Sequence, residues 1–159
     1  MSLINHRRRS ARWHGASQKV GQLADPLFLD RIDLQIEIAP LSFEELSKAA
    51  PGESSAQICE RVIRARHIQE QRYKDHPGIH CNAQMTEKLL NQYCVLDEPT
   101  RELLRQAMAR LNLSARAYSR ILKVARTISD LEGKENIEMH HVAEAVGYRS
   151  LDRGDWAER

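Results

Sequence analysis

SARAYSRILKVARTISDLEG, residues 114–133, carries the clearest helical pattern of the chain. Ser114 is of a residue type that caps helix N-termini with its side-chain oxygen. Gly133 is well placed to end the helix, because glycine adopts left-handed backbone angles without strain. Between them, apolar side chains recur at spacings of three and four, the period of an amphipathic helix. We therefore predict a helix whose core-facing stripe consists of Tyr118, Ile121, Leu122, Ala125 and Ile128.

The segments on either side of this helix also carry start signals. Thr86 precedes one apolar stretch, and Asp97 with Pro99 precedes another, since proline suits the first helical turn. A last helix is predicted over residues 138–148. The positions predicted to face the core are Leu89, Leu90, Tyr93, Leu103, Leu104, Ala107, Met108, Leu111, Val142, Ala145 and Val146.

Two more helices are predicted before residue 75. Ser42 with Glu45 forms a capping-box pattern for a short one, and residues 50–52 (APG) end it. Ser54 or Ser55 then caps a long helix. Its predicted inward positions are Ile58, Val62, Ala65 and Ile68.

Strand periodicity occurs once, where Leu34, Ile36 and Ile38 alternate with polar residues before Pro40. The predicted fold is therefore mainly α, a helical bundle preceded by one strand. A lone strand has no partner for its backbone hydrogen bonds. This mismatch suggests that the strand is the terminal one of a truncated α/β domain.

The composition is typical of a soluble globular protein: 42% of the 159 residues are hydrophobic and 29% are charged. A net charge of +2 gives no general case for nucleic-acid binding. The exception is the basic run at residues 6–14 (HRRRSARWH), which is either a solvated tail or a contact to phosphates. No apolar run is long enough for a membrane span, and no signal peptide is recognisable.

Three widely spaced cysteines, Cys59, Cys81 and Cys94, argue against a disulfide framework and fit the reducing cytoplasm. Residues 76–81 (HPGIHC) resemble a metal motif. Nothing else in the sequence completes a set of four zinc ligands, so we interpret this segment as a polar loop and predict no metal site.

A phosphate-binding loop is missing from the sequence. Such a loop needs a glycine-rich turn followed by lysine and a hydroxyl residue. Only Gly133 precedes a lysine, and Glu135 stands where the hydroxyl is required. We therefore expect that the chain does not hydrolyse ATP by itself.

Several stretches together resemble a known family: residues 28–33 (FLDRID), 81–85 (CNAQM), 93–94 (YC), 113–128 and 148–153 (YRSLDR). Their order and spacing resemble the C-terminal third of the YifB/ComM group, the magnesium-chelatase-like AAA+ proteins. The resemblance covers roughly residues 25–153, and residues 1–22 depart from it.

The resemblance implies a division of the chain into parts. Residues 1–22 are then a basic arm that we expect to be disordered. Residues 23–40 end the AAA+ core with the arginine-finger segment and its last strand. Residues 41–153 form the helical lid domain, and 154–159 a tail.

The resemblance also implies partners and cofactors. Members of the group are hexamer-forming ATPases with an N-terminal Lon-protease-like domain and a central AAA+ core, and ComM acts in DNA branch migration during natural transformation. The full-length protein would bind ATP and Mg²⁺, whereas this chain alone would bind neither. Its partners would be the AAA+ core, neighbouring subunits and DNA, with no membrane.

Arg116 is one of two main candidate site residues, with Arg31. A cation in the first turn of a helix opposes the helix dipole by roughly 0.3–1 kcal/mol, whereas a bound phosphate reverses that preference. The resemblance independently makes Arg116 the sensor-2 arginine, which contacts nucleotide in its own subunit. Arg120, one turn later, is a weaker candidate for the same face.

Arg31 is the arginine finger by the same resemblance, supplied to a neighbour's γ-phosphate. The alternative for Arg31 is an ion pair with Asp30 or Asp33. We interpret Arg126 as a solvated or interface residue. His140 and His141 are expected to be exposed.

Two other interpretations remain open. The chain could be a non-enzymatic helical module that binds DNA or a protein through its basic arm and helix faces, or a non-functional gene fragment. Dependence of binding on residues 7–12 would favour the module, and the lack of a stable fold would favour the fragment.

Overall fold

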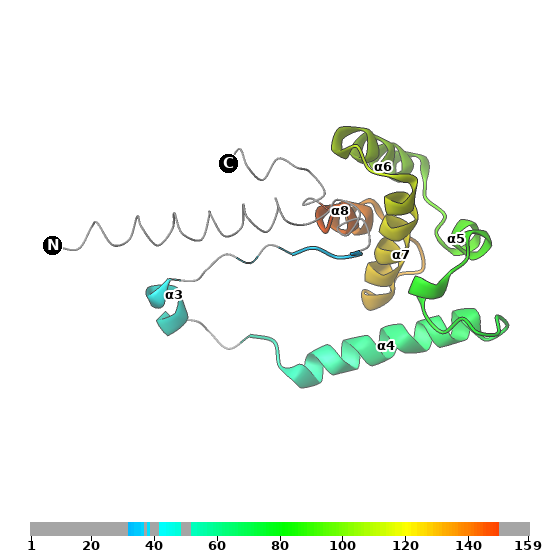
Figure 1. Cartoon of the computed structure of the whole chain (residues 1–159). Coiled ribbons are helices and arrows are strands. Elements are labelled where there is room, and N and C mark those ends of the chain that lie inside the picture. The colour runs from blue at the N-terminus through cyan, green and yellow to red at the C-terminus, as the bar shows by residue number, and fades with distance from the viewer. Residues whose placement is uncertain (1–31, 37, 39–41, 49–51, 150–159) are drawn as a thin grey trace.

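The computed structural model describes residues 32–36, 38, 42–48 and 52–149. The described part is helical, as predicted, and α7 stands at its centre (Figure 1). The elements are α3 (Phe43–Lys48), α4 (Ser55–Tyr73), the 3₁₀ helix η1 (Asn82–Gln84), α5 (Glu87–Tyr93), α6 (Glu98–Leu111), α7 (Ala115–Leu131) and α8 (Met139–Gly147).

The helix starts follow the predicted capping residues. Ser54 caps α4 in a reciprocal capping box with Gln57. The Asp97 carboxylate accepts from the Thr100 N–H at 3.0 Å at the start of α6. Ser114 accepts from the Ala117 N–H at 3.2 Å at the start of α7. The predicted starts are therefore confirmed. They were predictable because a cap is a local interaction within three residues of sequence.

Gly133 ends α7 as predicted. Its φ of 70° is left-handed, the Gly133 N–H donates to the Asp130 carbonyl, and the Lys134 N–H donates to the Ser129 carbonyl. These two bonds form a Schellman motif, which satisfies carbonyls left open at the helix end.

Replacing Gly133 with alanine is expected to lower the free energy of unfolding by about 1–2 kcal/mol. A Cβ meets no neighbouring atom there, so the loss comes from the left-handed backbone alone. Urea unfolding followed by circular dichroism measures it. Gly52→Ala is the control, because Gly52 also has free space but no left-handed φ. Equal stability of both variants would contradict the argument.

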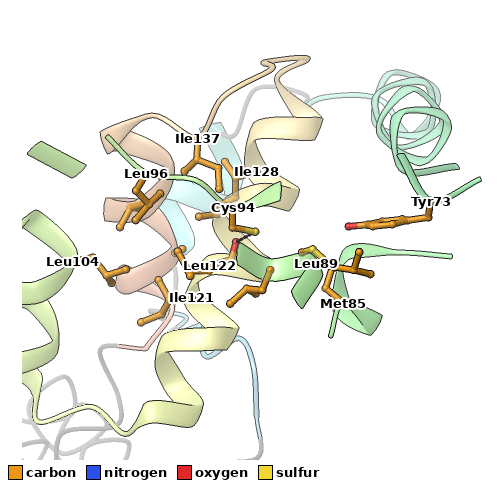
Figure 2. Packing of buried hydrophobic residues seen from close by; sticks show 14 residues of the cluster. Tyr73, Met85, Leu89, Cys94, Leu96, Leu104, Ile121, Leu122, Ile128 and Ile137 are labelled. Carbon is orange, nitrogen blue, oxygen red and sulfur yellow. Dashed lines mark hydrogen bonds between the residues drawn. The ribbon is translucent and has the colours of Figure 1, made fainter. Parts of the chain in front are cut away.

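The hydrophobic core surrounds α7, which packs against α4, α5, α8 and η1. Figure 2 shows Ile121, Leu122 and Ile128 of α7 among side chains from the other segments. Four of the five predicted stripe residues of α7 are buried. Tyr118 is the exception, with 40% exposure, so its predicted place in the core is wrong.

Helix α4 is buried only in its second half, through Ala65, Gln69 and Tyr73. Its first half extends beyond α7 (Figure 1). The predicted burial of Ile58 and Val62 is therefore wrong, as they are 42% and 41% exposed. The apolar period continues along α4, but among the described residues no element covers this part.

The predicted strand is not seen: residues 32–36 and 38 are irregular. Leu34, Ile36 and Ile38 are exposed, whereas Gln35 is buried and its N–H donates to the Tyr148 carbonyl at 2.9 Å. A strand needs a partner strand, and the described segments provide none. The predicted arm (1–22), the tail (154–159) and most of the predicted core segment lie outside the described residues. In the part of the chain that the structure describes, no helix could cross a bilayer.

Candidate functional site

The first turn of α7 places Arg116 as predicted. Arg116 is the second residue of the helix, two positions after the Ser114 cap, and its side chain is exposed. The first turn contains no acidic residue. A cation is therefore held beside the positive end of a helix dipole, an arrangement that an anion would stabilise.

Arg120 lies one turn further along α7 and forms an ion pair with Asp33, with Nε 2.8 Å from the carboxylate oxygen. The buried Arg149 side chain donates to the carbonyl of Ile32. Together with the Gln35 bond to Tyr148, these contacts hold residues 32–36 against α7 and the end of α8. Arg31 lies just outside the described residues, so its finger role stays a prediction.

A buried polar centre lies at the other end of α7, around Asp130. The Asp130 side chain is fully buried and binds Arg72 through two bonds of 2.7 and 2.5 Å. It also accepts from Arg126 Nε at 3.1 Å and from Asn82 Nδ2 at 2.8 Å. Burial of Arg72 disfavours its charged form, but the hydrogen bonds and the charge of Asp130 outweigh this effect and raise the pKa of Arg72 above its ordinary value. The centre thereby joins α4, η1 and α7.

Arg126 corrects a prediction, because its side chain is only 3% exposed and is not a solvated or interface residue. Its guanidinium donates to the carbonyls of Lys134 and Glu135, each at 2.7 Å, and to the Ser129 hydroxyl at 2.8 Å. Arg126 therefore holds the loop between α7 and α8 in place. The spacing of four between Arg126 and Asp130 was an available signal for this pair.

Two groups near this centre are poorly suited to chemistry at neutral pH. Burial raises the pKa of the Cys94 thiol to about 11. Burial also raises the pKa of Tyr73 to about 12, while its hydroxyl donates to Asn82 at 2.7 Å. Both remain protonated, so Cys94 does not provide a thiolate nucleophile.

His140 is exposed as predicted, but the expected exposure of His141 is wrong, since it is fully buried. The His141 Nδ1 accepts the Glu138 N–H at 2.8 Å, and Nε2 of each histidine lies 3.0 Å from the same Glu132 oxygen. These hydrogen bonds lower the pKa of Glu132. The set ties the end of α7 to the start of α8.

The same three side chains bring their ligand atoms within 4.8 Å of one another, as a metal centre would require. A metal on Nε2 of a neutral histidine needs the proton on Nδ1. In His141, however, Nδ1 accepts a backbone N–H, so the proton belongs on Nε2. The hydrogen bonding therefore opposes metal binding at this cluster.

Comparison with known proteins places this chain in a defined family. Residues 52–149, from just before α4 to just after α8, match the magnesium chelatase, subunit ChlI C-terminal family. The chain belongs to this family, which confirms the resemblance seen in the sequence.

The relatives are longer than this chain. It is 42% identical over 135 residues to the competence protein ComM of Haemophilus influenzae, covering 84% of this chain and 25% of that protein. It is 40% identical over 135 residues to YifB of Escherichia coli, covering 84% and 26%. The chain thus spans about a quarter of the length of these relatives.

Proposed function

We propose that this chain is the lid and inter-subunit part of an AAA+ ATPase of the ComM/YifB type. Arg116 is the sensor-2 arginine, Arg31 is the arginine finger for a neighbouring subunit, and Arg120 has a minor role on the face of Arg116. ATP and Mg²⁺ bind to a core that precedes this region in the full-length protein. Six such subunits form a cytoplasmic ring that acts on DNA.

The observation that carries this proposal is the position of Arg116. An exposed guanidinium in the first turn of α7 opposes the helix dipole, at a cost of roughly 0.3–1 kcal/mol. A nucleotide phosphate turns the same arrangement into a favourable one, because both the N–H groups and the guanidinium attract it. This position thus fits a role in nucleotide contact.

The test is Arg116→Ala at the matching position of a full-length relative. A charge-assisted contact is worth about 1.5–3 kcal/mol, so ATP turnover should fall by about ten- to a hundredfold. The fold should survive, because Arg116 is exposed. Steady-state ATP hydrolysis and circular dichroism measure the two effects. Arg64→Ala, at an exposed position of α4 paired with Glu60, is the control. Unchanged turnover in the Arg116 variant would remove the assignment.

A non-enzymatic binding module is the second candidate, and the exposed Ile58 and Val62 on the first half of α4 favour it. To test whether such a module binds DNA, DNA affinity is measured over a range of salt concentrations with and without residues 7–12. A module predicts that the deletion abolishes DNA binding and that Arg116→Ala leaves it unchanged.

A further inference from the structure

A hollow of about 440 Å³ lies beside the Asp130 centre, between the end of α4, the segment joining α5 to α6, and the loop joining α7 to α8. One part of its wall is apolar, formed by Ile68, Tyr93, Val95 and Ile137. Another part is cationic, formed by Arg72 and Arg126. Its volume falls within the range of small-molecule sites.

The Arg72 guanidinium lines the hollow and lies 5.9 and 6.0 Å from the ring centroids of Tyr73 and Tyr93. A guanidinium has five N–H donors. Nη1 donates to Asn82 and Asp130, and Nη2 donates to Asp130. The Tyr73 hydroxyl also lies near this guanidinium and helps to raise its pKa. Among the described residues, no hydrogen bond of good geometry involves the Nε–H or the second Nη2–H. These two N–H groups are parallel and form the side-on fork, which matches the two oxygens of a carboxylate.

The charges around this fork do not balance. Arg72 and Arg126 are two cations with side chains 11% and 3% exposed, and Asp130 is the one carboxylate between them. One positive charge therefore remains, partly offset by the C-terminal end of α7. Lys134 and Glu135 also line the hollow. Lys134 pairs with Glu138 at 3.2 Å, and the charge of Glu135 is exposed to water, which screens it. A ligand with a single negative charge would complete the neutralisation.

We propose that this hollow binds a small organic monocarboxylate, whose carboxylate lies on the open fork of Arg72. Its apolar part packs against Ile68, Tyr93 and Val95. The single excess charge favours a monocarboxylate over a phosphate dianion, and the apolar wall favours an organic body over an inorganic ion. The site is separate from Arg116, because the fourteen residues from Arg116 to Asp130 along α7 span roughly 21 Å.

The probe is benzoate, titrated into the whole chain while the ¹⁵N resonance of Arg72 Nε–H is followed by NMR. Benzoate should shift this resonance in a saturable manner. Benzamide, which has the same shape without the charge, and inorganic phosphate should each bind at least about tenfold more weakly. Equal binding of benzamide would overturn the role of charge, and equal or tighter binding of phosphate would overturn the choice of a monocarboxylate.

Two variants test the position of the ligand. Arg72→Lys keeps the charge but removes the fork, and should weaken benzoate binding at least tenfold. Val95 is exposed, so Val95→Trp should fill the hollow without disturbing the polar centre, and should also weaken benzoate binding at least tenfold. This variant keeps the proposal testable if Arg72→Lys does not fold. Arg64→Lys, exposed on the same helix as Arg72, is the matched control and should bind as the parent does. Unchanged affinity in the Val95→Trp variant, or in a folded Arg72→Lys variant, overturns the proposal.

Discussion

Replacing Asp130 with alanine is expected to lower the free energy of unfolding by about 3–5 kcal/mol. Removal of one partner from a buried ion pair leaves the remaining charge without compensation. Here two guanidiniums, Arg72 and Arg126, would face each other without the carboxylate that both bind. A domain of this size has a total stability of about 5–15 kcal/mol, so the loss is a substantial part of the total. Urea unfolding and thermal circular dichroism measure the loss.

The control for Asp130 is an ion pair that water already surrounds. Glu60 pairs with Arg64 on α4, and both side chains are more than 60% exposed. Glu60→Ala should therefore change stability by no more than about 0.5 kcal/mol. A loss below 1 kcal/mol for Asp130→Ala would show that the two arginines find other compensation and that the polar centre does not hold α4 to α7.

Local signals in the sequence were sufficient for the helices. Ser54, Asp97 and Ser114 start helices because each cap acts on backbone groups within three residues. Gly133 ends α7 because a left-handed residue is required there. The place of Arg116 in the first turn of α7 followed from the Ser114 cap by counting.

Burial of polar side chains was not predictable in this way. Arginine is mostly exposed in folded proteins and histidine is intermediate, so residue type alone did not indicate that Arg126 and His141 are buried. Their burial depends on the partners that the fold provides. The pair between Arg72 and Asp130 joins residues 58 positions apart, which no local pattern indicates. The carbonyls that hold Arg126 belong to a loop whose path is set by Gly133.

Periodicity predicts which face of an element is apolar, but not whether another element covers it. Tyr118 lies on the apolar stripe of α7, yet it is 40% exposed near the start of that helix. Leu34 and Ile36 alternate as a strand would, but residues 32–36 contact the bundle through polar groups and main chain instead.

Arg31→Ala in a full-length relative is expected to reduce ATP turnover about 10³-fold or more while ATP binding is retained, as for loss of an arginine finger. The competing interpretation is an ion pair with Asp30 or Asp33. It predicts a change of only about 0–1 kcal/mol in the free energy of unfolding and no large loss of turnover. Asp33 already accepts an ion pair from Arg120 at 2.8 Å, which weakens that interpretation. Single-turnover hydrolysis and nucleotide binding separate the two.

Mixed rings test whether the finger acts across the subunit boundary. Subunits with Arg31→Ala and an intact P-loop are combined with subunits that keep Arg31 but lack the P-loop lysine. A finger supplied in trans restores turnover, because the second kind of subunit places its arginine on ATP bound by the first. A residue that acts only within its own subunit leaves both kinds inactive, and the mixture would then show no gain. Arg31→Lys should behave like Arg31→Ala, because lysine keeps the charge but not the planar fork.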